Sequence, residues 1–249
     1  MIDNSPVIDF HGHVGRMDEF LAWDDPELML HAMDAVGIDQ SCVFNVWHPH
    51  GTGGNDRTAA FVARHPDRFI GFAYVSPTVP GGMVEELTRA VDELGMRAIK
   101  IYPPFGSYPL DHAAWDPIYA FAAERGLAII SHTGGEPTAN PADFGRAAAR
   151  FPGANFVAGH SGNAEPYRSQ AIVAARSTPN YFLETCSTFR TPGVIEQLVE
   201  GAGADRVLYG SDIPLMDPRA QIGKIITAEI DEEAKKLVLG GNARRLLQL

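Results

Sequence analysis

The feature that most constrains the fold is a regular alternation of short apolar strands with longer helical stretches. Runs rich in β-branched and aromatic residues predict eight strands, spaced by roughly 25–35 residues, or about one βα unit each. These strands are expected at residues 7–10, 41–46, 69–75, 98–102, 128–131, 155–159, 181–184 and 207–209. Helices are expected between them, for example from Pro26 to Val36, where a proline opens the helix and Gly37 stops it.

Eight strands alternating with eight helices are the pattern of a (β/α)8 TIM barrel, an α/β fold. No linker or low-complexity segment interrupts it, so residues 1–249 are expected to form a single domain. An open doubly wound sheet is the rival, but it usually has fewer strands, and no GxGxxG motif follows the first strand. The run Gly51-Thr52-Gly53-Gly54 is interpreted as a flexible loop rather than a phosphate-binding loop, and Asn55 as the cap of the next helix.

Charge and cysteine content limit the partners and the compartment. The formal net charge of −11 argues against nucleic acid or an anionic membrane surface as a partner, which leaves a small-molecule substrate. No apolar run reaches transmembrane length, and the first residues lack the basic and apolar regions of a signal peptide. Cys42 and Cys186 form no CxxC pair, so a reduced, cytoplasmic protein is expected. Barrels of this type commonly form homo-oligomers, although nothing in the sequence identifies an interface.

Histidine, lysine and aspartate recur where the predicted strands end, and chemistry in such a barrel collects at the carboxyl ends of the strands. The first strand is followed by His11 and His13, which point to the same side because they are two residues apart. Two converging imidazoles are a ready pair of metal ligands, although two exposed loop histidines would explain that pair alone. The fourth, fifth, sixth and eighth strands contribute Lys100, His132, His160 and Asp212. Each of these residues alone could have an ordinary structural role. Their recurrence at the same end of the predicted barrel is what predicts a functional site.

These strand ends resemble the amidohydrolase superfamily, specifically its amidohydrolase-related branch of metal-dependent TIM-barrel enzymes. The matching segments are Asp9-Phe10-His11-Gly12-His13, residues 98–103, Ser131-His132-Thr133-Gly134, residues 158–162, residues 209–214 and the tail at 239–243. The resemblance implies that His11, His13, His132 and Asp212 hold a divalent metal ion, most often zinc, with manganese as an alternative. It also implies that His160 is either a ligand of a second metal ion or a catalytic residue beside a single one.

Lys100 is open between two roles that the resemblance allows. In relatives with two metal ions, the lysine of the fourth strand is carboxylated and bridges the metals. In many members of this branch the site holds one metal ion, and the lysine acts unmodified on the substrate. One metal ion is expected here because single-metal sites are commoner in the branch, and the binuclear site is the alternative.

The residue types suit this chemistry. Three neutral imidazoles and one carboxylate suit Zn²⁺ or a similar cation and leave a position for water. Such a cation lowers the pKa of its bound water from about 16 towards about 7. Asp212 would then take the proton from that water and deliver it to a leaving group, while His160 would steady a developing oxyanion.

Two enzyme activities stay open, and the main prediction is a metal-dependent hydrolase of a small ester, lactone or amide. The alternative is a metal-dependent non-oxidative decarboxylase of an aromatic or unsaturated carboxylic acid. A barrel that only binds a metal or a partner is a third class, which the complete ligand set argues against. Arg16 and Tyr102 are candidate substrate contacts, although a surface arginine and a packing tyrosine are the plainer interpretations. Glu184 is undecided, and Cys186 is interpreted as a small buried residue.

Overall fold

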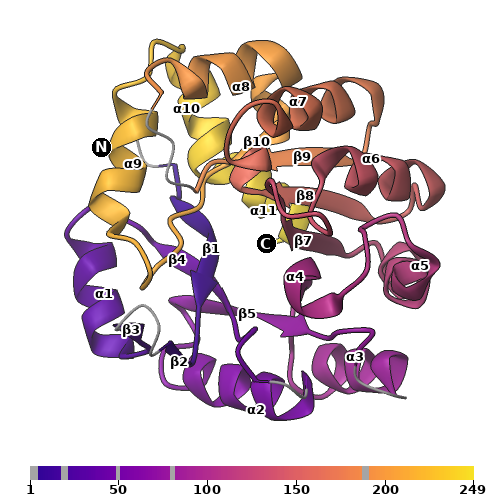
Figure 1. Ribbon diagram of the computed structural model, residues 1–249. Helices are drawn as coiled ribbons and strands as arrows, with labels where there is room; N and C mark the ends of the chain where they lie inside the picture. The colour runs from indigo at the N-terminus through magenta and orange to yellow at the C-terminus, as the bar shows by residue number, and fades with distance from the viewer. Residues whose placement is uncertain (1–4, 18–21, 49–50, 79–81, 187–190) are drawn as a thin grey trace.

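The strands of the computed structural model form a parallel barrel, as the sequence predicts (Figure 1). The structure describes residues 5–17, 22–48, 51–78, 82–186 and 191–249. Eight strands pair side by side in the order β1-β4-β5-β6-β7-β8-β9-β10, and each neighbouring pair is parallel. Their bounds are β1 Ile8–His13, β4 Gln40–Phe44, β5 Phe69–Tyr74, β6 Ala98–Ile101, β7 Ala128–His132, β8 Asn155–Gly159, β9 Tyr181–Glu184 and β10 Val207–Leu208.

Backbone hydrogen bonds join the segment after β10 to β1 and bring the barrel close to closure. The N–H of His13 donates to the carbonyl of Ile213 at 2.7 Å, and the N–H of Asp212 donates to the carbonyl of His11 at 2.8 Å. Gly12 and Ile213 form a parallel bridge between the same two segments. This seam places the carboxyl ends of the first and last strands, with His11 and Asp212, beside each other.

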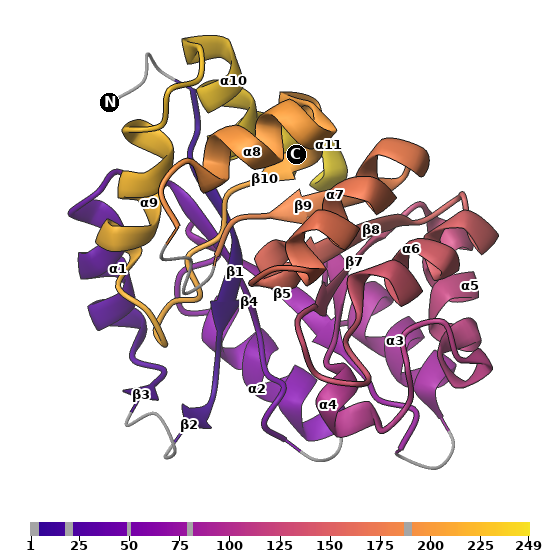
Figure 2. The same ribbon diagram turned by 45° about the horizontal axis from the view of Figure 1, so that its top comes forward.

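Helices follow the strands and cover the outside of the barrel (Figures 1 and 2). They are α1 Pro26–Asp34, α2 Gly51–Val62, α3 Met83–Asp92, α5 Asp116–Arg125, α6 Pro141–Arg150, α7 Tyr167–Ser177, α8 Val194–Ala202 and α9 Pro218–Ile226. Shorter elements are the ribbon of β2 Arg16–Met17 and β3 Ala22–Trp23, α4 Pro103–Gly106, α10 Glu232–Lys236 and α11 Asn242–Leu247. None of the helices in the described ranges is both long and apolar enough to span a membrane.

The core has two parts because successive strand residues face opposite sides of a sheet. One buried cluster contains strand residues such as Phe10, Phe44 and Phe72, together with Leu246 and Leu247 of α11. A second, larger cluster joins the alternate strand residues to the helices. Phe44 of the first cluster packs against the site, since its ring centroid is 5.2 Å from that of His11.

Three local predictions near β1 and α2 differ from the structure. His11 and His13 lie within β1 rather than beyond its end, with an irregular register between Asp9 and Gly12. The glycine run at 51–54 is not a loop but the first turn of α2. These glycines serve close packing, because a Cβ at Gly51 would lie 2.7 Å from the carbonyl oxygen of Tyr74.

Asn55 does not cap α2, because it lies inside the helix. Its side chain bonds instead to the backbone of Tyr74 on β5, accepting from the N–H at 2.7 Å and donating to the carbonyl at 3.1 Å. The predicted cap is therefore wrong, and this asparagine ties the helix to the end of a strand. The sequence pattern could not indicate this, since the partner is 19 residues away.

Candidate metal centre and active site

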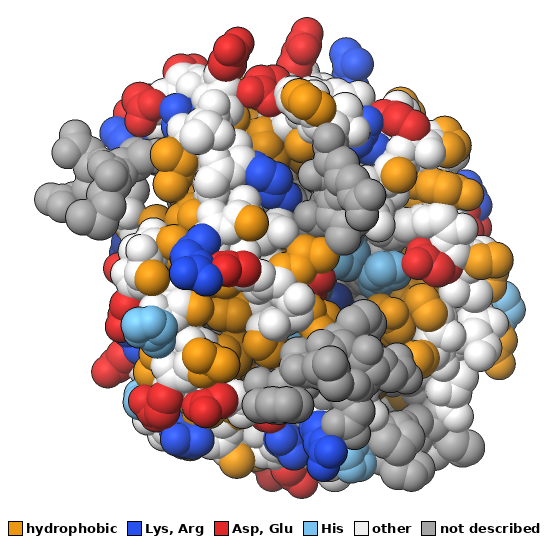
Figure 3. Space-filling view, turned by 60° about the vertical axis from the view of Figure 1, so that its left-hand side comes forward, with side chains coloured by type: hydrophobic (Ala, Val, Ile, Leu, Met, Phe, Trp, Pro, Cys, Tyr) orange, Lys and Arg blue, Asp and Glu red, His pale blue; other side chains and the backbone are white. Residues whose placement is uncertain are grey.

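The predicted site residues, with one exception, line a single pocket of about 240 Å³ at the carboxyl ends of the strands. Its walls are His11, His13, Trp47, Lys100, Tyr102, His132, His160, Asn163, Asp212, Leu215 and Met216. Figure 3 shows histidine side chains gathered in a hollow on this side of the molecule. The exception is Arg16, which is exposed on β2 and is not among the described residues of the pocket wall.

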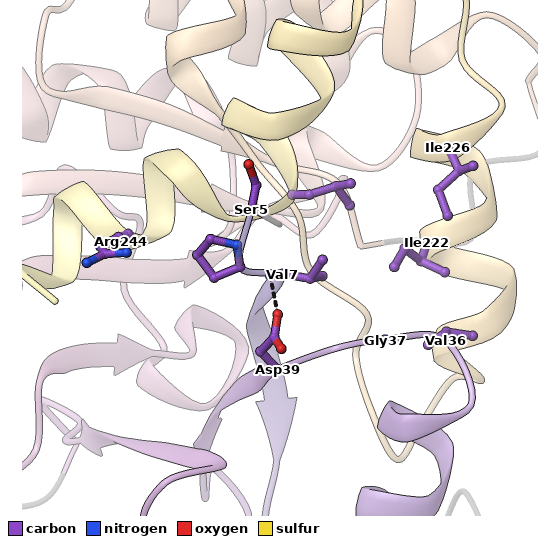
Figure 4. Close-up of a pocket in the computed structure, with 10 residues that line it drawn as sticks. Ser5, Val7, Val36, Gly37, Asp39, Ile222, Ile226 and Arg244 are labelled. Carbon is purple, nitrogen blue, oxygen red and sulfur yellow. Dashed lines mark hydrogen bonds between the residues drawn. The ribbon is translucent and has the colours of Figure 1, made fainter. Parts of the chain in front are cut away.

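A larger cavity of about 570 Å³ lies at the other end of the barrel, beside the start of β1 (Figure 4). It is lined mainly by apolar groups such as Ile222 and Ile226 of α9, with Asp39 and Arg244 as its charged residues. Asp39 is already engaged, because it accepts a hydrogen bond from the N–H of Val7 at 2.7 Å. Within the described ranges, the clusters of metal-ligating groups lie elsewhere, so size does not identify the functional site.

His11, His13 and Asp212 form a compact group of potential metal ligands. One ligand atom from each lies within 4.8 Å of the other two. Oδ1 of Asp212 is 3.0 Å from Nε2 of His13 and 3.5 Å from Nε2 of His11, yet it is buried and accepts no well-angled hydrogen bond. A buried polar atom without a partner costs about 1–3 kcal/mol. Lone pairs that converge in this way fit a bound cation.

The charge states of this group also suit a cation. Burial lowers the pKa of His11 and of His13, which favours the neutral imidazole that can offer a lone pair. Burial opposes ionisation of Asp212, but contact with His11 and His13 holds the pKa of Asp212 below its usual range. The three residues together offer two neutral nitrogen ligands and one anionic oxygen.

The backbone at two site residues is strained. Asp212 has φ 68° and His160 has φ 65°, both in the left-handed region that non-glycine residues rarely adopt. Such strain costs on the order of 1–3 kcal/mol at each residue and persists where the surroundings over-determine it. At Asp212 the N–H bond to the carbonyl of His11 is one such restraint.

His132 lies in the pocket but outside the three-residue ligand group. Its Nε2 is 3.2 Å from Oε2 of Glu136, and its ring packs edge-on against His160 with centroids 4.7 Å apart. This contact with His132 lowers the pKa of Glu136 to about 2. Glu136 was not anticipated from the sequence, and the role of His132 as a metal ligand stays a prediction.

Lys100 and His160 also line the pocket. Nζ of Lys100 lies 3.2 Å from Nε2 of His11 and 4.4 Å from the ring centroid of Phe44. Burial lowers the pKa of Lys100 to about 8 and that of His160 to about 4. Nδ1 of His160 is 2.9 Å from the carbonyl oxygen of Cys186, which leaves Nε2 of the neutral ring available.

Three buried residues beside the site had no predicted role: Asp9, Glu184 and Cys186. Oε2 of Glu184 is 2.9 Å from Nδ1 of His11, and Sγ of Cys186 is 3.1 Å from the same nitrogen. Asp9 accepts hydrogen bonds from Ser211. A sequence signal existed for the two acids, because a carboxylate inside an apolar strand is seldom buried without a partner.

The chain is similar to a described family and to several known proteins. The model of a family described as Amidohydrolase matches residues 8–249. A gamma-resorcylate decarboxylase of Polaromonas sp. is 26% identical over 255 residues, covering 78% of this chain and 75% of that protein. The structure of 5-carboxyvanillate decarboxylase from Sphingomonas paucimobilis has a TM-score of 0.79 at 18% identity and covers 99% of this chain and 100% of that one. The enzyme of that name from Novosphingobium aromaticivorans, complexed with manganese, has a TM-score of 0.80 at 18% identity, with 99% and 97% covered.

The expectation of a hydrolase is wrong, because the curated relatives are named decarboxylases. Their names favour the alternative activity that the sequence left open. The physical reason for the error is that the same groups serve both reactions. A carboxylate and an imidazole beside a metal ion can activate water or carry a proton to carbon. The strand-end residues therefore predict the kind of site but not the bond that is broken.

Proposed function

This chain belongs to the amidohydrolase family, and from that premise we propose that it is a metal-dependent, non-oxidative decarboxylase of a small aromatic carboxylic acid. The supporting observation is that one small pocket combines a ligand group, a buried cation and aromatic walls. Its volume of about 240 Å³ is below the roughly 300–1,000 Å³ of pockets for drug-sized ligands, so it suits a single substituted ring. Trp47 and Tyr102 provide aromatic surface for such a ring.

We propose that His11, His13 and Asp212 hold one divalent ion, with His132 as the candidate fourth ligand. The buried oxygen of Asp212 that accepts no hydrogen bond supports this assignment. Manganese is the first ion to test, since the Novosphingobium enzyme was crystallised with it, although two imidazoles and a carboxylate also suit zinc. When bound, the ion would withdraw electrons from the oxygen atoms of the substrate and fix their position.

We assign roles to the remaining pocket residues from their charge and their ability to carry a proton. Lys100 is the buried cation nearest to the ligand group and is assigned to an anionic oxygen of the substrate. In the reaction the bond from the ring to its carboxylate breaks, CO₂ departs, and the electron pair stays on the ring carbon. That carbon then takes a proton. Asp212 is ionised in the resting site, so it is assigned to accept a proton from the bound acid or from solvent and return it to carbon, with His160 as the second candidate.

The sequence-based expectations for compartment and assembly are carried forward as proposals. Cys42 and Cys186 are both free and buried, which suits a reducing, cytoplasmic setting. The proposed partner is a small aromatic acid, and the homo-oligomer is carried forward as a proposal with no interface assigned.

The deciding experiment follows the fate of solvent atoms. Hydroxylated benzoic acids, including gamma-resorcylate and 5-carboxyvanillate, would be incubated with the manganese- or zinc-loaded protein in deuterated water. We expect CO₂ release and one deuterium at the vacated ring carbon. Small lactones and amides run in oxygen-18 water form the opposing arm. Label in a product carboxylate, with no CO₂ from any acid, would replace decarboxylation with hydrolysis.

A further inference from the structure

Glu184 is a buried carboxylate at the end of β9 that the proposed reaction does not use. Its Oε2 lies 2.9 Å from Nδ1 of His11, and both side chains are 0% exposed. The same oxygen accepts the backbone N–H of His160 at 3.1 Å, and Oε1 accepts the N–H of Cys186. One carboxylate therefore holds together β1, the turn after β8 and the end of β9.

The surroundings of Glu184 resemble a second metal site, but their hydrogen bonds argue otherwise. His11, His160, Glu184 and Cys186 offer ligand atoms within 4.8 Å of one another. Nδ1 of His11 and Nδ1 of His160 already face acceptors, the carboxylate and the carbonyl of Cys186. Sγ of Cys186 lies beside the same two nitrogens, 3.1 Å from Nδ1 of His11 and 3.2 Å from Nδ1 of His160. These groups satisfy one another without a cation.

We propose that Glu184 is a positioning residue that fixes the tautomer of His11, with the proton on Nδ1 and the lone pair on Nε2. Nε2 is the nitrogen that faces the pocket, 3.2 Å from Nζ of Lys100 and 3.5 Å from Oδ1 of Asp212. In the opposite tautomer, a lone pair on Nδ1 would face the carboxylate, and the hydrogen on Nε2 would block a cation. A carboxylate behind an imidazole also makes the ring a stronger ligand. This inference rests on the proposed metal role of His11 and not on decarboxylation.

The backbone around Glu184 is arranged to keep this contact. A Cβ at Gly210 would collide with the carboxylate of Glu184 and with the side chain of His11. Only glycine at this position therefore leaves space for the contact between them. The hydroxyl of Ser161 donates to the backbone carbonyl of Glu184 at 2.8 Å. Ser161 thus bonds to the backbone of Glu184 and not to its carboxylate, which makes it the matched control.

The first arm of the test reads the tautomer of His11 in the metal-free protein. In protein labelled with nitrogen-15 histidine, long-range proton–nitrogen NMR correlation spectra distinguish the Nδ1–H and Nε2–H forms of the ring. The signals of His11 are identified as those that are missing from the spectrum of His11→Asn. We expect the Nδ1–H form in the wild type and in Glu184→Gln, whose amide oxygen can still accept that proton. Glu184→Met offers no acceptor and should lose this preference, while Ser161→Ala should keep it.

The second arm measures Mn²⁺ affinity by competition with a chelator. The dissociation constant should rise by about 10–100-fold in Glu184→Met, the usual cost of losing a partner behind a ligand, with a smaller rise in Glu184→Gln and none in Ser161→Ala. A wild type with its proton on Nε2 would overturn the proposal. A folded Glu184→Met protein with an unchanged tautomer or with wild-type Mn²⁺ affinity would do the same. A wild type that binds no metal would overturn the proposed function instead, and the tautomer would still decide the role of Glu184.

Discussion

Ser211 donates its N–H to Oδ1 of Asp9 at 2.8 Å and its hydroxyl to Oδ2 at 2.5 Å, across 202 positions of the chain. The same carboxylate accepts the N–H of His11 at 3.1 Å and the hydroxyl of Ser41 at 3.1 Å. Asp9 thereby fixes the backbone of His11 and the residue before the strained Asp212. One buried acid links the seam of the barrel to the geometry of the ligand group.

Asp9→Ala should lower the free energy of unfolding by at least about 1–3 kcal/mol, because two buried N–H groups lose their acceptor. Asp9→Asn should cost much less. The amide oxygen can accept both N–H groups, and the amide nitrogen can donate to two hydroxyls that rotate to accept. Burial raises the pKa of Asp9 to about 7, so a neutral side chain suits this position. Chemical denaturation of the metal-free proteins measures the difference, and equal losses in the two variants would contradict this account.

The hydrogen bonds of Glu86, on α3, predict that the free energy of unfolding depends on pH. It accepts a hydrogen bond from Nδ2 of Asn55 at 2.8 Å and one from Nε of Arg89 at 2.9 Å. Burial works to raise the pKa of Glu86, but the donors of Arg89 and Asn55 outweigh it and lower the pKa below the usual 4.5. This contribution to stability is therefore full above the unfolded-state pKa and is lost as the pH falls through the lower folded-state pKa.

The wild type should thus lose more free energy of unfolding than Glu86→Gln between about pH 6 and pH 3. Denaturant titrations at several pH values measure both proteins, with Glu85→Gln on the same helix as the control. Parallel stability curves for wild type and Glu86→Gln would show that Glu86 carries no such linkage.

The barrel and most of the pocket were predictable because both depend on local pattern. Lys100 sits in an apolar strand and His132 ends one, so a parallel topology alone brings them to the same mouth. The contact between Glu184 and His11 was not predictable, since it depends on which side of β9 faces the barrel and on a partner 173 residues away. The helical start of α2 at its glycines was not predictable for a related reason. Glycine marks flexibility or close packing, and which of the two applies depends on spatial neighbours such as Tyr74 beside Gly51 and His48 beside Gly53.

The metal assignment predicts close to one divalent ion per chain in the purified protein, removable by a chelator. The double variant His11→Ala/His13→Ala removes both nitrogen ligands of the group and should lose that ion. His31→Ala changes an exposed histidine on α1 and is the control. Metal analysis after dialysis gives the stoichiometry, and a full equivalent of metal in the double variant would remove these residues from the site.

A variant of Lys100 distinguishes a site with one metal ion from a site with two. If it contacts the substrate as an unmodified cation, Lys100→Met should keep its metal and lower kcat/KM by about 10–100-fold. That loss corresponds to the ~1.5–3 kcal/mol of a hydrogen bond to a charged group. A carboxylated lysine that bridges two ions would instead cost the variant one metal equivalent. Two ions in the wild type, or added CO₂ in its intact mass under native conditions, would contradict the single-metal site.

Asp212→Asn tests the proton transfer itself. Asp212 is ionised and lies 3.0 Å from Nε2 of His13, so it is placed both to contact a cation and to carry a proton. The amide of asparagine keeps an oxygen for the cation but cannot hold a transferable proton in the same way. At saturating Mn²⁺, with the metal content of the variant verified, decarboxylation should fall by at least ~10²-fold, the low end for lost acid–base catalysis. Asp217→Asn, at the exposed cap of α9, is the matched control. A metal-loaded Asp212→Asn protein with near-normal turnover would assign the proton to another group, and His160→Gln would then be the variant to measure.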